Sequence, residues 1–408
     1  MHVMLVADGR SPTSRRWVQA VLALGHQVTL VSTFPCDFIS GSQATYILPL
    51  AFAGMAGSQV GRNGAALPVA RRSRAIVRQF RSLFLAGRYY LGPLTLPYYA
   101  HYFKLLVNEV KPDLIHALRI PFEGMLAAYA PPEFPLAVST WGNDLTYHAR
   151  GSSMMRRFTT RTLRRADALL ADAQRDLRLG YQWGFDPQKP VLVVPGGAGI
   201  DLVEMHQLSD QSIDSFAGGL PLDAPLVVNP RGFRPGSVRN DIFFQAIPLV
   251  LARNPKVFFI CSAMDGQPEA LHWIRRLKIE QNVRLLPYLS QPQLWGLFKR
   301  STILASVSAH DGIPNSFLEG IACGCFPVVG DIESLREWIS PGMNGMLVPP
   351  DNPQALAEAL LVALDHPELL AAAADQNLLL IRQRAEAGLV RAQIEVFYQR
   401  LVSANTTL

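Results

Sequence analysis

The sequence predicts an α/β protein with two successive domains, each built on a parallel sheet that is covered by helices. Three observations support this fold class. The chain has 408 residues, which is long for a single hydrophobic core. Short apolar runs alternate with helical segments along its length, as in parallel sheets buried on both faces. A polar stretch near 203–220 divides these runs into two series.

The first series begins with a strand at 2–7. A segment with helical periodicity follows at 14–24, and Gly25 ends it. Further β-rich apolar runs occur at 27–32, 113–117, 136–140, 168–171 and 190–195. No run reaches the roughly 18 apolar residues of a spanning helix, and no basic segment precedes an apolar stretch at the start. We therefore expect a cytoplasmic protein without a secretory signal.

The second series has the same alternation of strands and helices. Its predicted strands lie at 225–229, 257–261, 283–286, 303–305, 326–329 and 345–348. Its predicted helices lie at 240–253, 267–279, 291–299, 315–323, 333–339 and 353–365. Apolar residues at helical spacing follow at 388–402. We expect one domain over 1–205, a second over 206–385, and a final helix and tail over 386–408.

The net charge of +6 is unevenly distributed. Residues 1–200 contain 22 lysines and arginines against 11 acids, and the remainder contains 16 against 21. Many of the basic residues lie in the segment 71–88, where arginines alternate with apolar residues. This pattern predicts a basic amphipathic helix, which is a candidate for peripheral contact with an anionic membrane, on its inner face, or for contact with an anionic acceptor. The alternative is a helix packed in the domain with solvated arginines. Nucleic acid is not an expected partner, because no aromatic or zinc-binding module accompanies the basic residues.

The four cysteines do not form a recognisable site. Cys36, Cys261, Cys323 and Cys325 are too few for a disulfide framework. The pair at 323 and 325 lacks a second pair of metal ligands, so we expect both residues to lie in the core.

The segment 308–330 carries the strongest functional signal. It predicts a polar loop, a short helix that begins near Pro314, and a buried strand. Free backbone amides at Asn315, Ser316 and Phe317 would favour an anion at the helix N-terminus. Asp311 and Glu319 place a carboxylate on either side of it, as a ligand with both phosphate and sugar hydroxyl groups would need. From spacing alone, a capped surface helix with two solvated acids remains the alternative.

This segment resembles the donor-binding motif of the family-4 retaining glycosyltransferases, in which a Glu, seven residues and a second Glu precede Ala-x-Ala-Cys-Gly-x-Pro-Val-Val. Glu319 matches the second Glu, which in the family holds the ribose hydroxyls. Asp311 stands where the family has the first Glu, which contacts the donor sugar, and its side chain is one methylene shorter. The resemblance implies the GT-B fold, in which two Rossmann-like domains face each other across a cleft and a C-terminal helix crosses back to the N-terminal domain. It also implies donor contacts from Gly312, Ile313, Asn315, Ser316 and Phe317.

The loop 229–241 resembles the family's Gly-Arg loop, where an Arg and a Lys five residues later hold the pyrophosphate. Arg231 matches the Arg, and Gly236 occupies the expected Lys position. Arg234 or Arg239 would have to replace that Lys, and the following residues favour Arg239. We therefore predict that Asp311, Arg231 and Arg239 act in catalysis. Three solvated loop arginines are the alternative.

Other positions follow from the same resemblance. Tyr288 and Leu289 fall where relatives pack the nucleobase. On the acceptor or sugar side, the resemblance suggests Gly9, Arg10, His116, Trp141 and Asp144. Trp141 occupies a position where many relatives have a His, so no general base is expected there. A structural role remains the alternative for His116.

These features predict a retaining glycosyltransferase that moves a sugar from a nucleotide-diphosphate sugar to an acceptor hydroxyl. Asp-x-Asp metal motifs are absent from the sequence, so we expect no metal or other cofactor. Asp311, Gly236 and Trp141 differ from the residues that the family has at these positions. A second hypothesis is therefore that the chain is a non-catalytic sugar-nucleotide-binding partner of a membrane-associated glycan-assembly complex. A GT-B phosphorylase or epimerase is a third.

Overall fold

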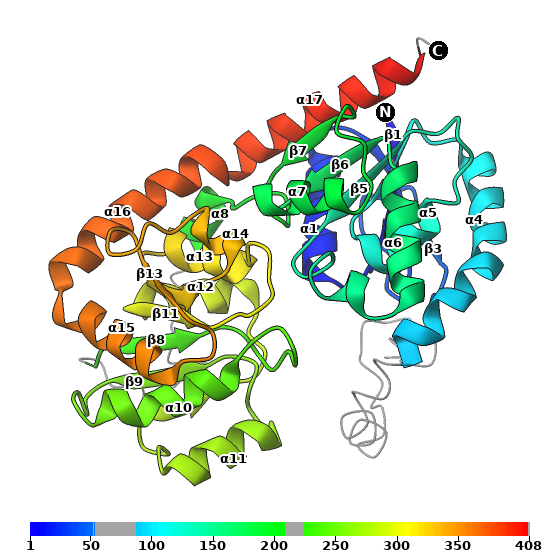
Figure 1. Ribbon diagram of the computed structural model, residues 1–408. Coiled ribbons are helices and arrows are strands. Elements are labelled where there is room, and N and C mark those ends of the chain that lie inside the picture. Colours follow the sequence, from blue (N-terminus) through cyan, green and yellow to red (C-terminus); the bar gives the residue numbers. More distant parts are fainter. Residues whose placement is uncertain (52, 54–86, 209–223, 407–408) are drawn as a thin grey trace. The chain divides into compact units, whose positions relative to one another are not determined.

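The computed structural model describes residues 1–51, 53, 87–208 and 224–406 (Figure 1). The chain forms two compact units, each with its own parallel sheet. Unit 1 comprises Met1–Ala198 and the segment from Val390 onward, and unit 2 comprises Gly199–Leu389. The sequence placed the corresponding domain ends at 205 and 385. The predicted α/β class is confirmed.

Unit 1 contains a seven-stranded parallel sheet with the order β3-β2-β1-β4-β5-β6-β7. Its strands are β1 (His2–Ala7), β2 (Gln27–Ser32), β3 (Ala44–Ile47), β4 (Leu114–Ala117), β5 (Leu136–Thr140), β6 (Ala168–Ala171) and β7 (Val191–Val193). All except β3 were predicted. The strand order reverses between β1 and β4, so the loops that follow these two strands diverge at the carboxyl edge of the sheet. Ligands of open α/β sheets bind at such a point.

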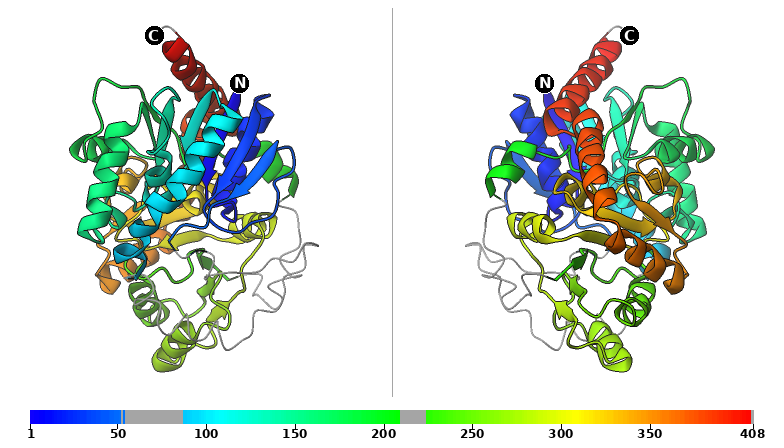
Figure 2. Two further views of the ribbon diagram at one scale, coloured as in Figure 1. Left: turned by 90° about the vertical axis from the view of Figure 1, so that its right-hand side faces the viewer. Right: turned by 90° about the vertical axis from the view of Figure 1, so that its left-hand side faces the viewer.

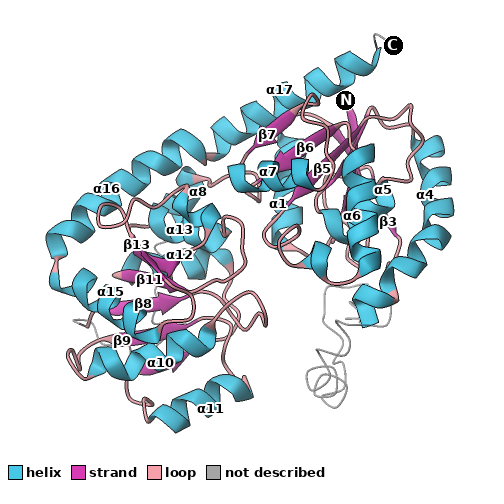
Figure 3. Ribbon diagram, in the orientation of Figure 1, coloured by secondary structure: helices cyan, strands magenta, loops and turns pink. Residues whose placement is uncertain are grey.

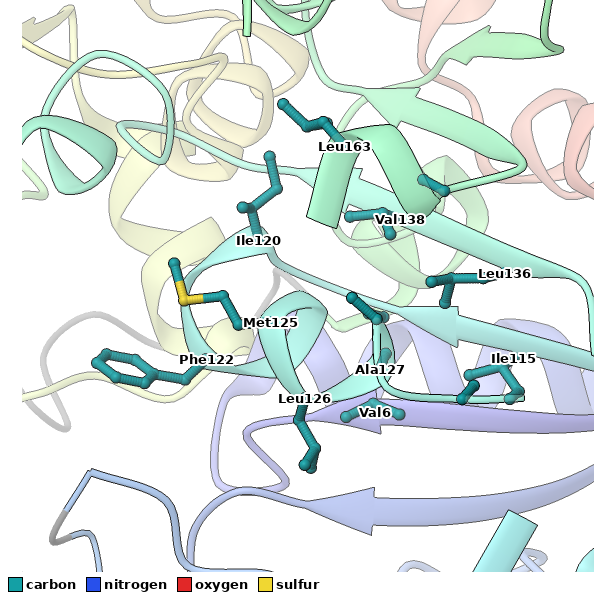
Figure 4. Close-up of a cluster of buried hydrophobic side chains, with 14 of the residues drawn as sticks. Val6, Ile115, Ile120, Phe122, Met125, Leu126, Ala127, Leu136, Val138 and Leu163 are labelled. Atoms are coloured by element: carbon teal, nitrogen blue, oxygen red, sulfur yellow. The ribbon is translucent and has the colours of Figure 1, made fainter. Parts of the chain in front are cut away.

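Alternate residues of the unit 1 strands enter two different cores, because successive side chains point to opposite faces. Met4 and Val6 pack with α4 (Leu96–Val110), α5 (Met125–Ala127) and α6 (Ser153–Arg165). Figure 4 shows part of this core around Ile115, Met125 and Val138. On the other face, the side chains of Val3 and Leu5 pack with α1 (Pro12–Ala23) and α17 (Ala387–Thr406).

The remaining elements of unit 1 are short. They are η1 (Gly92–Thr95), η2 (Ile120–Gly124), η3 (His148–Arg150) and α7 (Gln174–Gln182). In η2, Phe122 has φ +67° and ψ −53°, which is a strained conformation for a bulky residue. The predicted helix 14–24 is α1, which is capped by Ser11 and followed by Gly25 at φ +82°.

Unit 2 contains a six-stranded parallel sheet with the order β10-β9-β8-β11-β12-β13 (Figure 3). Its strands are β8 (Leu226–Asn229), β9 (Phe258–Cys261), β10 (Val283–Leu285), β11 (Ile303–Ser306), β12 (Phe326–Gly330) and β13 (Met346–Val348). Its helices are α8 (Leu202–Leu208), α10 (Asn240–Leu251), α11 (Pro268–Leu277), α12 (Gln291–Arg300), α13 (Asn315–Ala322), α14 (Glu333–Arg336), α15 (Pro353–Asp365) and α16 (Pro367–Arg384). The six predicted strands and six predicted helices are all present, and α8 and α16 are additional.

The sequence predicts two features that concern membranes, a basic helix at 71–88 and no spanning helix. Most of the basic segment 71–88 lies outside the described residues, which resume at Gly87. Within the part of the chain that is described, no helix is long and apolar enough to span a bilayer.

Candidate active site

The strand order of the unit 2 sheet reverses between β8 and β11, and the two sequence motifs follow these two strands. The loop after β8 carries Arg231, and the loop after β11 carries Asp311. Because parallel strands present their carboxyl ends at the same edge, the topology brings these loops together. Arg231 Nη2 donates to Asp311 Oδ2 over 2.5 Å. The two sequence motifs are therefore brought together by the order of the strands.

The Arg231–Asp311 pair is buried and held from several directions. Arg231 is only 7% exposed, and within the described chain its Nε has no hydrogen-bond partner. Asp311 accepts a second hydrogen bond at Oδ2 from Ser308 Oγ, at 3.3 Å, and one at Oδ1 from the Gly312 amide, at 3.1 Å. Ser334 Oγ also donates to the Asp311 carbonyl, at 3.0 Å. The guanidinium is thus fixed at one end, while its buried Nε–H has no hydrogen-bond partner in the described chain.

Backbone pairing between the two loops fixes this geometry. The Arg239 amide donates to the Val307 carbonyl, and the Ala309 amide donates to the Ser237 carbonyl. Asn229, at the end of β8, accepts a hydrogen bond from the Arg231 amide at its Oδ1. Its Nδ2 donates a hydrogen bond to Asn240 Oδ1. The site is therefore positioned by strand ends and paired loops.

Gly330, at the end of β12, allows the loop after β11 to pass directly over the sheet. A Cβ at this position would lie 2.3 Å from the Ser308 carbonyl oxygen and 2.9 Å from its amide nitrogen. Both are backbone atoms, so relief requires the loop carrying Asp311 to move.

We expect Gly330→Ala to destabilise the protein by about 1–3 kcal/mol, the usual cost of overpacking. Urea denaturation would measure this, with Gly87→Ala as the control because nothing lies within 4 Å of a Cβ there. Equal stability of the two variants would contradict the close approach.

The other two arginines of the loop after β8 lie differently. Gly236 has φ +78°, and the Ser237 amide donates to the Arg234 carbonyl, so residues 234–237 form a turn that requires a left-handed residue at 236. This explains why a Lys does not stand at 236. Arg234 is exposed on the turn. Arg239 forms a bidentate ion pair with Asp241, at 2.9 and 2.8 Å, and this hydrogen bonding lowers the pKa of Asp241. The guanidinium of Arg239 is thus held by Asp241 and not by Asp311.

The start of α13 differs in part from the prediction. Pro314 is the N-cap, and Asn315 is the first helical residue. The Phe317 amide donates to the Pro314 carbonyl at 2.9 Å, so the prediction that this amide is free for an anion is wrong. The side chains of Ile313 and Phe317 are buried. Their side chains therefore pack in the unit 2 core, and Ser316 lies half-buried at the helix start.

Glu319 is a buried carboxylate on the same helix. Its Oε1 accepts a hydrogen bond from Gln291 Nε2, on α12, at 3.0 Å. Gln291 had no signal in the sequence. Of the two residues predicted at the base, Leu289 is buried, whereas the ring of Tyr288 is 76% exposed. Of these two residues, Tyr288 is the one whose side chain is exposed enough to stack on a base.

In unit 1, Gly9 and Arg10 lie in the loop after β1. A Cβ on Gly9 would meet Cys36 Sγ at 2.4 Å, so this glycine serves close packing. Arg10 pairs with Asp8 and lies 3.6 Å above the Phe34 ring centroid. Phe34 also lies 5.0 Å from the guanidinium of Arg88.

Trp141 and Asp144 contribute to the interior of unit 1. Asp144 is fully buried and forms an ion pair with Arg119. It also accepts hydrogen bonds from the backbone amides of Ile120 and Trp141. Asp144 thus orders the chain around these amides, and its contact with an acceptor or sugar stays a prediction. Trp141 is half-buried and packs against Trp17, with a centroid distance of 6.3 Å.

His116, which the resemblance placed on the acceptor or sugar side, is fully buried in unit 1. Its Nδ1 lies 2.6 Å from Tyr398 Oη, and its Nε2 lies 2.8 Å from Ser139 Oγ. Trp17 Nε1 donates to the same tyrosine oxygen. Every group is satisfied if Tyr398 donates to Nδ1 and the Nε2–H donates to Ser139. Burial lowers the pKa of His116 to about 3, which keeps the imidazole neutral.

This shift predicts a loss of stability in acid. His116 has a pKa of 6.5 when exposed and about 3 in the folded chain, so the unfolded chain binds the proton first as the pH falls. The neutral imidazole makes its full contribution to the free energy of unfolding above about pH 6.5. This contribution is lost towards pH 3, by up to about 1.4 kcal/mol per pH unit. Urea unfolding across this pH range should show that the free energy of unfolding depends less steeply on pH in His116→Gln than in the unaltered chain. Identical slopes would contradict a neutral buried imidazole.

Sequence reasoning missed a group of residues near the Arg10 loop in unit 1. Glu123 is buried and accepts a hydrogen bond from Thr33 Oγ1 at 2.6 Å, and burial raises the pKa of its carboxyl. Arg88 lies between the rings of Phe34 and Phe122. A strained Phe122 beside a buried Glu123 gave no local sequence signal, because the group forms only when β2, η2 and residue 88 meet.

Comparison with known families assigns each unit. Residues 8–197 match the family described as Glycosyl transferase 4-like domain, and residues 233–366 match Glycosyl transferases group 1. The first match covers most of unit 1, and the second covers most of the unit 2 sheet and the loop that carries Asp311.

Individual relatives are more distant. The chain is 25% identical over 217 residues to a D-inositol 3-phosphate glycosyltransferase of Jonesia denitrificans, covering 50% of each chain. The alignment thus spans about half the length of that curated relative. A sucrose-phosphate synthase from Thermosynechococcus elongatus superposes with a TM-score of 0.74 at 16% identity, over 99% of this chain and 100% of the other. Anabaena Alr3699/HepE in complex with UDP and glucose superposes with a TM-score of 0.70 at 17% identity, over 98% and 100%. At these identities the structures establish a shared fold.

Proposed function

The chain belongs to the group 1 glycosyltransferases and has the GT-B fold, and from this premise we propose that it transfers a sugar, with retention, from a nucleotide-diphosphate sugar to an acceptor hydroxyl. The observation that supports this most is the buried Arg231–Asp311 pair where the strand order of the unit 2 sheet reverses.

Arg231 is suited to stabilise the departing diphosphate. A guanidinium is always charged and binds phosphate oxygens in a fixed geometry. Burial strengthens its electrostatic effect, and its Nε–H has no partner in the described chain. Because Asp311 already orients Nη2, little reorganisation is needed when negative charge develops on the leaving group.

The carboxylates are suited to the two sugars of the donor. The carboxylate of Asp311 would accept a hydrogen bond from a hydroxyl of the transferred sugar. Glu319 would accept hydrogen bonds from the ribose, and Gln291 fixes its orientation. The exposed ring of Tyr288 would stack on the base. The HepE complex contains UDP, which favours uridine as the first base to test.

Retention fits attack of the acceptor on the face from which the diphosphate leaves. In that mechanism a leaving-group oxygen takes the acceptor proton, so no protein nucleophile or base is required. Trp141, in place of a His, is compatible with this route.

We also propose that the segment 71–88 contacts an anionic membrane. This proposal rests on sequence, where Arg71, Arg72, Arg74, Arg78 and Arg81 lie among apolar residues.

A thermal-shift screen tests the donor site. The purified chain is heated with UDP, GDP, ADP, TDP and CMP, alone and as sugar conjugates. One diphosphate should stabilise it selectively, because a ligand that binds only the folded state raises the melting temperature. Glu319→Ala should lose this shift, and the exposed Glu358→Ala should keep it. An unchanged shift in Glu319→Ala would remove Glu319 from the site.

Turnover then separates transfer from binding. Release of the nucleoside diphosphate from the selected sugar conjugate in the presence of acceptor supports the enzyme. Binding without any release would support the non-catalytic partner instead.

A further inference from the structure

Unit 1 exposes an unusual number of large apolar side chains on one short stretch. Tyr98 is 61% exposed, and five more large side chains between residues 90 and 105 are also exposed, namely Tyr90, Leu91, Leu94, Tyr102 and Leu105. In α4, Tyr98, Tyr102 and Leu105 follow helical spacing, opposite the buried Ala100 and Phe103. The outer face of the helix therefore carries a stripe of large aromatic and apolar side chains, beside the exposed polar residues His101, Lys104, Asn108 and Glu109.

A second helix of the same layer is strongly basic on its outer face. Arg157, Arg161 and Arg164 recur at helical spacing on α6, opposite the buried Thr159 and Leu163. With Arg165, they line a shallow open depression. The helix contains no Asp or Glu. Its outer face thus presents a stripe of guanidinium groups.

The two faces belong to one surface. Both α4 and α6 cover the same side of the unit 1 sheet, with α5 between them (Figures 1 and 2). The stretch before η1 contacts the start of α6, since Ser152 Oγ donates to the Tyr89 carbonyl at 2.8 Å. Between residues 87 and 110 the sequence has one acidic residue, Glu109, which is exposed in the last turn of α4. We call this surface the Tyr–Arg face, defined by Tyr90, Leu94, Tyr98, Tyr102, Leu105, Arg157, Arg161 and Arg164.

We propose that the Tyr–Arg face docks on the surface of an anionic bilayer. Tyrosine is enriched at the membrane–water interface, where its ring lies near the acyl chains and its hydroxyl remains hydrated. Adjacent arginines match anionic headgroups in charge. The observation that selects a lipid surface is the combination of exposed aromatic and apolar groups on α4 with a stripe of arginines on α6, a helix without acidic residues, in the same layer. This surface is distinct from the segment 71–86, and the proposal does not depend on sugar transfer.

Vesicle flotation of the full chain tests the proposal. The chain should float with vesicles of phosphatidylcholine and phosphatidylglycerol, and it should not float with phosphatidylcholine alone. Replacing Arg157, Arg161 and Arg164 by Gln should lower the partition coefficient on the order of 100-fold, from the usual contribution of each basic residue near an anionic surface. The double variant Tyr98→Ser with Tyr102→Ser should also lower the partition coefficient, and this loss should depend less on the salt concentration than the loss in the arginine variant.

Matched variants in unit 2 serve as controls, and they leave 71–86 and the candidate active site unchanged. Arg253, Arg275 and Arg276 are exposed and can be replaced by Gln, and the exposed Leu271 and Leu379 can be replaced by Ser. These should float like the unaltered chain. Circular dichroism melts would show that all variants fold.

Three results would overturn the proposal. Equal flotation with neutral vesicles would remove the charge argument. Unchanged flotation of both Tyr–Arg variants would place binding elsewhere on the chain. A dimer in light scattering that Tyr98→Ser with Tyr102→Ser dissociates, without flotation, would assign the face to a second copy of the chain.

Discussion

Replacing Arg231 by alanine should lower kcat/KM for sugar transfer by about 10²–10³-fold, the usual effect of removing one preorganised charge donor from an active site. The guanidinium is buried and already oriented by Asp311. Its loss also leaves the Asp311 carboxylate buried without its partner, which costs about 3–5 kcal/mol of folding free energy. Nucleotide release and urea denaturation would measure the two effects.

The double variant Arg231→Ala with Asp311→Ala separates these effects. Removing both charges should restore much of the stability, because no uncompensated charge remains in the interior. Activity should not return. The exposed Arg253→Ala should change neither quantity. Activity of Arg231→Ala within about twofold of the unaltered chain would refute the role of this guanidinium.

The second large effect is expected in unit 1, at Tyr398. This side chain of α17 is fully buried, accepts a hydrogen bond from Trp17 Nε1 at 3.1 Å, and lies 2.6 Å from His116 Nδ1. Tyr398→Ala should lower the free energy of unfolding by about 3–5 kcal/mol, the usual cost of deleting a buried aromatic side chain. Urea denaturation followed by tryptophan fluorescence would measure it.

Two matched variants on the same helix locate the cause. Tyr398→Phe keeps the ring but leaves the Trp17 N–H and the His116 Nδ1 without a partner, so we expect a loss of about 1–3 kcal/mol. Val396 is 66% exposed, and Val396→Ala should cost less than about 0.5 kcal/mol. A Tyr398→Ala protein as stable as Val396→Ala would show that α17 is not needed to hold unit 1 together.

The strand pattern of this chain was predictable because its parallel sheets are buried on both faces. Runs such as 226–229 and 303–306 are apolar at almost every position, so periodicity and length identify them. The edge strand β3, with its partly exposed Ala44–Ile47, has no such run and was missed.

The candidate site was predictable where a local motif carries it. Arg231 and Asp311 were placed by their loops, and the pairing followed from the strand order. Gln291 and Ser334 could not be predicted, because their contacts depend on how α12 and α14 pack against those loops. The hydrogen bonds of His116 could not be predicted for a related reason. Its partners Tyr398 and Ser139 are 282 and 23 residues away, and no local pattern reveals that both ring nitrogens are satisfied.

The discontinuity of unit 1 has a consequence for the order in which the protein folds during synthesis. The Trp17–Tyr398 hydrogen bond joins residues 381 positions apart, and all of unit 2 lies between them. The ribosome therefore synthesises all strands of unit 2 before α17. Until α17 emerges, the sheet face formed by Val3 and Leu5 lacks part of its cover, although its strands are already made. Unit 1 is thus the part that stays incomplete for longest during synthesis, and the part most in need of a chaperone.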